Sequence, residues 1–214
     1  HDTNTIELTK MLGKDIDYLV SEYVYSEFFN KIITCIEVYN GNPASRYTKH
    51  EKYYYQLLDD GWKLSAINGQ DNHRINFDQA EYLTAYIAND FSKNSLIDAF
   101  RNHRTYSTES RFLKFYFNID ETFMGEIISI YSPKIKFSIF CEDIRYKIKE
   151  IQIISNNGSI IKKIEDINLN NIKYIYEHEN LLTETWYVIK VLQEDNKTAV
   201  SSPIFINHLN NYYN

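Results

Sequence analysis

Cysteine, proline and glycine are all scarce in this sequence, which has two, three and six of them among 214 residues. Cys35 and Cys141 are too few and too far apart for a disulfide framework or a zinc knuckle, so we expect two buried free thiols. No linker rich in proline, glycine or serine divides the chain. We therefore expect its parts to pack against one another.

Long apolar runs and clustered basic residues are missing as well. No stretch approaches the roughly 20 apolar residues that cross a bilayer, so we expect a soluble chain without a membrane span. The net charge of -6 argues against nucleic acid or an anionic membrane as the main partner. A glycine-rich phosphate loop and a serine nucleophile elbow are also absent. A small, locally bound ligand fits this composition better.

The start of the sequence carries no leader pattern. The first residue is His1 rather than methionine, and no charged and then apolar stretch with a small-residue cleavage site follows it. We expect an upstream segment to have preceded His1, and the cellular compartment is left open.

The first half of the chain, residues 1–108, alternates amphipathic stretches with short apolar runs, which is the α/β pattern. Gly41 and Pro43 interrupt the chain after the first strand, and Ser92 is a good N-cap for the last helix. The spacing predicts helices over residues 15–29, 44–60 and 92–100, and strands over residues 31–39, 62–68 and 83–88.

The second half, residues 109–214, changes to a period of two. Apolar residues alternate with polar ones in about seven short runs: residues 112–117, 127–130, 134–140, 148–154, 172–176, 186–192 and 204–206. Such runs, separated by turn residues, predict an all-β sandwich with one dry face on each sheet. We expect its core to contain Phe137, Ile139, Trp186 and Ile204.

Asp71 and His73 directly follow the predicted strand at residues 62–68. Alternation along an extended chain sends both side chains to the same side. A carboxylate and an imidazole on one side can serve as two ligands for zinc, manganese or iron. The alternative is an aspartate that caps a turn beside a surface histidine, which is a common arrangement.

Several short segments, in this order along the chain, carry a resemblance to a known family. Residues 60–73 resemble the Gly-Ser-Asp-x-His strand end of the PHP (polymerase and histidinol phosphatase) superfamily, specifically its CehA/McbA-like branch. Residues 36–41, Ile-Glu-Val-Tyr-Asn-Gly, look like the "EVYNG" strand end of that branch. Further similar segments are residues 99–108, with Arg-x-Tyr-x-Thr, and the sandwich landmarks Met124-Gly125, Trp186-Tyr187 and residues 201–204.

The resemblance implies an α/β segment belonging to a distorted β/α barrel, followed by the β-sandwich. It also implies divalent metal ions, zinc, manganese or iron, and a metal-bound hydroxide that attacks a phosphate ester or a related anionic ester. Asp71 and His73 carry over as metal ligands, and His1 corresponds to the histidine of a His-Pro pair. Two departures are plain: Asp2 stands where proline is expected, and Gln70 replaces the usual serine.

Three other residues complete the expected site. Glu37 sits at a strand end, where it supports a ligand or is structural. Arg104 and Tyr106 contact an anionic substrate group or, alternatively, fix the junction with the sandwich. His50, on a charged stretch, is expected at the surface, and His103, His178 and His208 are expected to be structural or exposed.

The N-terminal His-x-His segment, from which the family takes its first ligands, is missing from this sequence. The leading hypothesis is therefore a metal-dependent hydrolase present as a partial catalytic domain. The alternative is a non-catalytic fragment or pseudoenzyme whose sandwich serves binding or assembly. Because a partial barrel leaves strand edges uncovered, we expect a homodimer or association with an N-terminal fragment.

Overall fold

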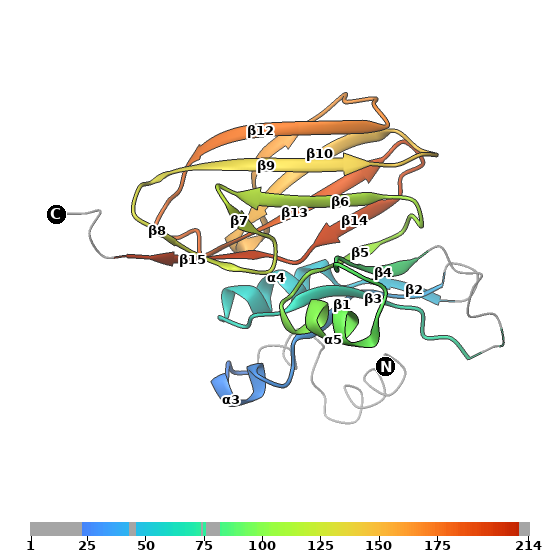
Figure 1. Cartoon of the computed structure of the whole chain (residues 1–214), viewed down its shortest axis with the longest axis horizontal. Coiled ribbons are helices and arrows are strands. Elements are labelled where there is room, and N and C mark those ends of the chain that lie inside the picture. The colour runs from blue at the N-terminus through green and yellow to red at the C-terminus, as the bar shows by residue number, and fades with distance from the viewer. Residues whose placement is uncertain (1–22, 43–45, 74, 76–81, 210–214) are drawn as a thin grey trace, which may run out of the picture.

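The structure is a computed structural model and describes residues 23–42, 46–73, 75 and 82–209. A β-sandwich lies above a smaller unit of one sheet and three helices (Figure 1). The helices are α3 (Glu27–Asn30), α4 (Glu51–Asp59), α5 (Lys93–Arg101) and the 3-10 turn η1 (Asn156–Gly158). The strands are β1 (Cys35–Asn42), β2 (Arg46–Lys49), β3 (Ser65–Gly69), β4 (Leu83–Tyr86), β5 (Thr105–Thr108), β6 (Lys114–Ile119), β7 (Thr122–Phe123), β8 (Ile127–Ile130), β9 (Lys134–Glu142), β10 (Ile148–Ser155), β11 (Ser159–Ile164), β12 (Asn171–Glu179), β13 (Trp186–Gln193), β14 (Thr198–Ser201) and β15 (Ile204–His208).

The smaller sheet has the strand order β2-β1-β3. β1 and β3 are parallel, with Cys35 opposite Ser65, whereas β2 runs antiparallel to β1 from Tyr39 onward. Helix α4 connects β2 to β3, as a parallel pair requires a crossover. The carboxyl ends of β1 and β3 therefore lie side by side.

The predicted helix over residues 44–60 is wrong in its first part. Residues 46–49 form β2 instead, and α4 begins only at Glu51. Tyr47 and Thr48 have aromatic and β-branched side chains that suit a strand, and pairing with β1 satisfies their backbone. The helical period survives in α4, where Tyr54 and Leu58, four residues apart, are buried on one face.

The predicted sandwich is confirmed as two sheets packed on a shared core. The four-stranded sheet has the order β12-β9-β6-β7, and the larger sheet has β11-β10-β13-β14-β5-β4, with β15 and β8 joined at β13. Burial alternates along β6, β8 and β9, as the period of two predicts. Phe137, Ile139 and Ile204 lie in the core between the sheets, as expected.

Strand β13 is buried on both of its faces, whereas the sequence predicted one buried face for each sheet. Tyr187, Ile189 and Val191 point into the sandwich core. Trp186 and Val188 belong to a second core, which the larger sheet shares with α4 and the small sheet. The expectation that Trp186 lies between the two sandwich sheets is therefore wrong. A strand buried on both faces is apolar throughout, as Trp-Tyr-Val-Ile is.

The expected partial β/α barrel is wrong. Among the described residues of the smaller unit, β1 and β3 are the one parallel pair, and the next strand does not extend their sheet. β4 pairs with β5, and β5 pairs with β14 of the sandwich. The chain thus leaves the small sheet after β3, so an open three-stranded sheet forms. The larger sheet spans the boundary predicted at residue 108, and that boundary stays a prediction.

The remaining expectations concern helices. The predicted helix over residues 15–29 lies mostly outside the described residues, and its described end contains only α3. The predicted helix at residues 92–100 is confirmed by α5, whose N-cap Ser92 accepts a hydrogen bond from the Ser95 N–H. Within the described part of the chain, no helix has the length and apolar character needed to cross a bilayer.

Phe137 on β9 allows the assignment of the sandwich core to be tested through the free energy of unfolding. Phe137 is fully buried and contacts the Tyr187 ring edge-on, at 5.0 Å between centroids. Phe137→Ala should lower the free energy of unfolding by about 3–5 kcal/mol, because it leaves a cavity that the sheets fill only in part. Urea denaturation followed by circular dichroism measures this change.

Phe140 on the same strand provides the matched control. It faces the outside of the sandwich and stacks on Tyr116 at 5.1 Å. Phe140→Ala should cost clearly less than Phe137→Ala, and equal costs would contradict the assignment of inner and outer faces.

Candidate functional site

The carboxyl ends of β1 and β3 form one edge of the small sheet. In open α/β sheets, ligands bind outside the carboxyl ends of parallel strands, because loops and polar side chains gather there. Glu37 and Asn40 come from β1, and Asp71 and His73 follow β3 after Gly69. Asn40 pairs with Gly69 across this sheet, two residues before Asp71.

Asp71 and His73 converge on each other. Asp71 Oδ1 lies 3.2 Å from His73 Nε2, and the His73 side chain is 84% exposed. The two side chains meet, as predicted, but the backbone between them is not the extended chain on which the prediction was based. Asp71 has φ 45°, in the left-handed region that aspartate tolerates better than most residues. A turn after β3 therefore brings the two side chains together.

Glu37 and Asn40 lie against the end of β3. The Asn40 side-chain amide donates to Glu37 Oε2 at 2.7 Å. The Glu37 carboxylate covers Gly69, where an added Cβ would lie 2.6 Å from Glu37 Cδ. Gly69 is therefore the residue that admits the Glu37 carboxylate to this edge. Both alternatives for Glu37, a structural residue and a support for a ligand, remain open.

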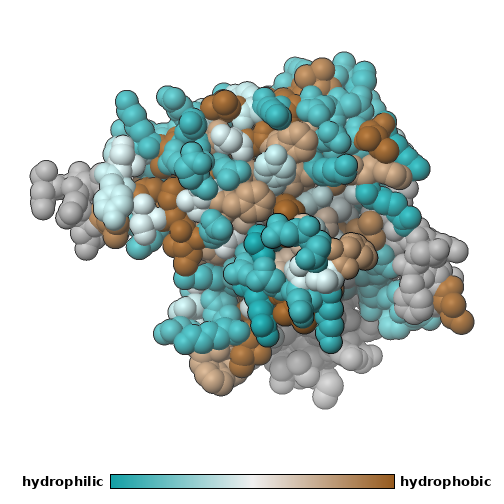
Figure 2. Space-filling model, viewed as in Figure 1, coloured by the Kyte–Doolittle hydropathy of each residue, from teal (hydrophilic) through white to brown (hydrophobic). Residues whose placement is uncertain are grey.

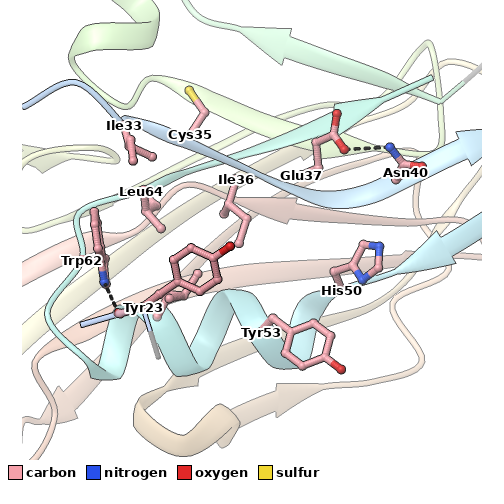
Figure 3. A pocket seen from close by; sticks show the side chains of 11 residues that line it. Tyr23, Ile33, Cys35, Ile36, Glu37, Asn40, His50, Tyr53, Trp62 and Leu64 are labelled. Carbon is pink, nitrogen blue, oxygen red and sulfur yellow. Dashed lines mark hydrogen bonds between the residues drawn. The ribbon is translucent and has the colours of Figure 1, made fainter. Parts of the chain in front are cut away.

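A pocket of about 610 Å³ runs along β1 and opens beside these residues (Figure 3). Its walls are mostly apolar, with polar groups from Glu37, Asn40 and His50 at one end. The lining residues are Tyr23, Ile33, Cys35, Ile36, Glu37, Asn40, His50, Tyr53, Leu57, Trp62 and Leu64.

His50 was expected to be a solvated surface residue, but it is half-buried at this pocket. Its Nε2 lies 2.9 Å from the Thr48 hydroxyl. Sequence reasoning missed His50 and Asn40 as neighbours of Glu37, because residues 46–49, which form β2 and lead to His50, were expected to belong to a helix. The strand-like pair Tyr47-Thr48 was the available signal.

Arg104 and Tyr106 lie away from the Asp71–His73 pair. Tyr106 is buried in the sandwich core, and its hydroxyl donates to the Leu113 carbonyl at 2.8 Å. Arg104 forms an ion pair with Asp98 in a separate polar pocket near Lys63, at the amino end of β3. Whether the two residues contact a substrate or fix the junction with the sandwich stays a prediction.

His103 is held near the same amino end of β3. Its Nδ1 lies 2.9 Å from the Ser65 hydroxyl, and its backbone is in the left-handed region with φ 54°. Burial lowers the pKa of His103 below its usual 6.5, and nearby Lys63 lowers it further, while a hydrogen bond to the Thr34 backbone opposes the shift. The expected structural role of this histidine fits these contacts.

Buried polar contacts join the small sheet to the sandwich. Glu109, 5% exposed in its side chain, lies 3.0 Å from Lys49 Nζ and accepts from the Thr198 N–H and the Tyr47 hydroxyl. The Tyr39 hydroxyl donates to Glu51, and burial raises the pKa of Tyr39 well above its usual value. These contacts fix β1 and β2, and with them the edge that carries Glu37.

The donor set for a metal is incomplete in the described residues. The 3.2 Å between Asp71 Oδ1 and His73 Nε2 is the distance of a direct ion pair, and it also falls within the roughly 3.0–3.5 Å that separates two ligand atoms bound to one ion at about 2.0–2.2 Å. In the described ranges, no group of three or more His, Cys, Asp or Glu side chains is arranged to hold a metal. His1, the third expected ligand, lies outside the described residues.

Comparison with known proteins gives one distant relative. No family model matches the chain. An uncharacterized protein of Chlamydia trachomatis serovar D is 26% identical over 225 residues, a match that covers 86% of this chain. The match covers 36% of the Chlamydia protein, so the chain spans about a third of the length of this relative. The resemblance to the PHP superfamily stays a prediction.

The contact between Glu37 and Gly69 can be tested by a double-mutant cycle. Gly69→Ala should lower the free energy of unfolding by about 1–3 kcal/mol, because the added methyl group displaces the Glu37 carboxylate from Asn40. In a Glu37→Ala background the same change should cost much less. Equal costs in the two backgrounds, measured by urea denaturation, would rule out this contact.

The buried His103 predicts a dependence of stability on pH. Its folded pKa lies below 6.5, so the unfolded chain binds a proton first as the pH falls through 6.5. The free energy of unfolding should then drop by up to about 1.4 kcal/mol per pH unit until the folded protein is protonated too. His103→Asn, which tolerates the left-handed backbone, should remove this contribution.

Thermal denaturation between pH 7 and pH 5 measures the effect. His73→Asn, which removes a mostly exposed histidine, is the control for losing a histidine elsewhere. A His103→Asn protein whose stability falls as steeply as the parent's over this range would refute the assignment.

Proposed function

We propose that this chain contributes part of the active site of a metal-dependent hydrolase that acts on a phosphate ester or a related anionic ester. The observation that carries the proposal is the convergence of Asp71 and His73 at the carboxyl end of β3, with Oδ1 and Nε2 3.2 Å apart. The resemblance to the PHP superfamily adds the reaction class. Zinc, manganese and iron all accept this pair of donors.

The two side chains supply a hard carboxylate oxygen and an imidazole nitrogen to one ion. A catalytic metal site uses about three protein ligands, so at least one further donor completes it. A bound divalent ion would acidify water and stabilise negative charge on the ester oxygens. Asp71 and His73 would fix the position of the ion at the edge of the sheet, where a substrate can reach it from solvent.

Glu37 and Asn40 have a supporting role in this proposal. Their mutual hydrogen bond, and the packing of the Glu37 carboxylate on Gly69, fix the end of β3 two residues before Asp71. The turn that carries Asp71 thus starts from a rigid position. Arg104 and Tyr106 are outside this arrangement, because they lie with the amino end of β3 and in the sandwich core.

A second candidate function is non-catalytic binding or assembly. It is supported by the apolar pocket along β1, which is larger than two metal ligands need. The two candidates differ in one respect that an assay can read: hydrolysis needs Asp71, whereas binding at the pocket does not.

Metal binding and turnover test the hydrolase proposal. Isothermal titration with Mn²⁺ or Zn²⁺ should give one site that is weakened at least tenfold in Asp71→Asn. Phosphodiester and phosphomonoester model substrates, with added manganese, zinc or iron, should be hydrolysed by the chain or by a version extended upstream. Turnover should fall by about 10² or more in Asp71→Asn, as expected when an ion loses a ligand.

Asp120 offers a matched control for this substitution. Like Asp71, it has a left-handed backbone, with φ 50°, but it lies in the turn between β6 and β7. Asp120→Asn should leave metal affinity and turnover unchanged. If both variants lose affinity alike, or if the parent binds no metal in either length, the hydrolase proposal fails.

A further inference from the structure

The first half of β1 has an open edge. Cys35, Ile36 and Glu37 pair with β3 on one side, and β2 pairs with β1 only from Tyr39 onward. The Ser65 N–H donates to the Thr34 carbonyl, so the parallel ladder uses Thr34 and Ile36 on the β3 side. The backbone groups of Cys35 and Glu37 therefore point away from β3. Among the described residues, no strand pairs with this edge.

The apolar pocket lies along the same edge. Cys35 and Glu37 point to one face of the sheet, whereas Ile36 points to the face covered by α4 (Figure 3). All three line one pocket. A single pocket can be lined from both faces of a strand only at the edge of that strand. The space therefore has the position of an additional strand, with room for its side chains on both faces.

An exposed apolar segment continues from this pocket. Residues 23–33 include Tyr23, Val24, Phe28, Phe29, Ile32 and Ile33, each between 47% and 78% exposed. Tyr23 and Ile33 also line the pocket. Apolar side chains gather on the surface over α3, at the lower side of the molecule (Figure 2). Large apolar patches of this kind mark interaction sites.

We propose that a second copy of this chain covers this surface, with the open β1 edges of the two copies paired antiparallel about a two-fold axis. The N–H and C=O groups of Cys35 and Glu37 on this edge form the hydrogen bonds between the copies, before Val38, whose carbonyl already accepts from the His50 N–H. Identical edges meet in this way because antiparallel pairing is itself two-fold symmetric.

The edge has few of the features that keep strands apart. Natural edge strands are protected by charged side chains, especially lysine, by proline or by a bulge. Residues 35–37, Cys-Ile-Glu, contain neither lysine nor proline, and the bulge of β1 comes after Glu37. Glu37 is the one charged residue among these three.

The exposed apolar side chains supply a large part of the area that a dimer buries. Tyr23, Phe28 and Phe29 are 62%, 68% and 53% exposed. Since a buried aromatic side chain covers about 150–250 Å², these three alone offer roughly 350 Å² on each copy. Val24, Ile32 and Ile33, with the pocket walls, bring this total towards the roughly 800 Å² that each partner of a stable complex buries. The small sheet would become continuous across the two copies.

Sedimentation velocity over a range of concentrations tests the proposal on the chain itself. The monomer mass of 25.5 kDa should double as the concentration rises. Ile32→Lys should weaken the dimer at least tenfold, because it places a charge in the apolar contact. Ile175 on β12 is also 66% exposed and is the matched control, so Ile175→Lys should leave the dimer intact.

Amide hydrogen exchange separates edge pairing from a contact through α3 alone. The Cys35 and Glu37 amides should exchange more slowly in the dimer than in dilute monomer, whereas the Ile36 amide, which faces β3, should be slow in both.

Three outcomes would overturn the proposal. They are a monomer at all concentrations up to about 100 μM, a dimer that Ile32→Lys does not weaken, and Cys35 and Glu37 amides that are already slow in the monomer because the chain's own polypeptide covers them. Circular dichroism shows that each variant is folded.

Discussion

The burial of α4 between the small sheet and the sandwich is the contact on which the rest of the arrangement depends. Tyr54 and Leu58 of α4 share one core with Trp186 and Val188 of β13. Polar contacts fix both ends of the helix: the Trp186 indole N–H donates to Asp59 at 3.0 Å, and Lys190 pairs with Glu51 at 2.6 Å. Without this layer the larger sheet would expose an apolar face, and β1 would lose its support.

The site follows from this docking. Because α4 is the connection between β2 and β3, fixing the helix also fixes where β3 begins and in which direction it runs. The carboxyl ends of β1 and β3 then project from the edge of the small sheet, where Asp71 and His73 are open to solvent. Among the described residues, no strand pairs with the other side of the first half of β1. The small sheet thus has polar residues at the carboxyl ends of its parallel strands and an apolar surface along the first half of β1.

The distribution of strands explains why an α/β pattern in the sequence does not become a barrel. A barrel requires each successive strand to join its neighbour in parallel. β4 instead meets β3 through side chains, with the Asn68 N–H donating to the Thr84 hydroxyl at 2.8 Å, while its backbone pairs with β5. The period of the apolar residues indicates that a segment is a strand, but the identity of its partner depends on residues far away in the chain.

The sequence by itself determined the sandwich, α5, the helical face of α4 and the proximity of Asp71 and His73, because these depend on local period and on neighbouring residues. Only the tertiary structure decided that residues 46–49 pair with β1, that β13 is buried on both faces and that Glu37 reaches Gly69. It also separated Tyr106 from Asp71, although both belong to segments that resemble one family. Such relations depend on which surfaces meet, and no local pattern encodes that choice.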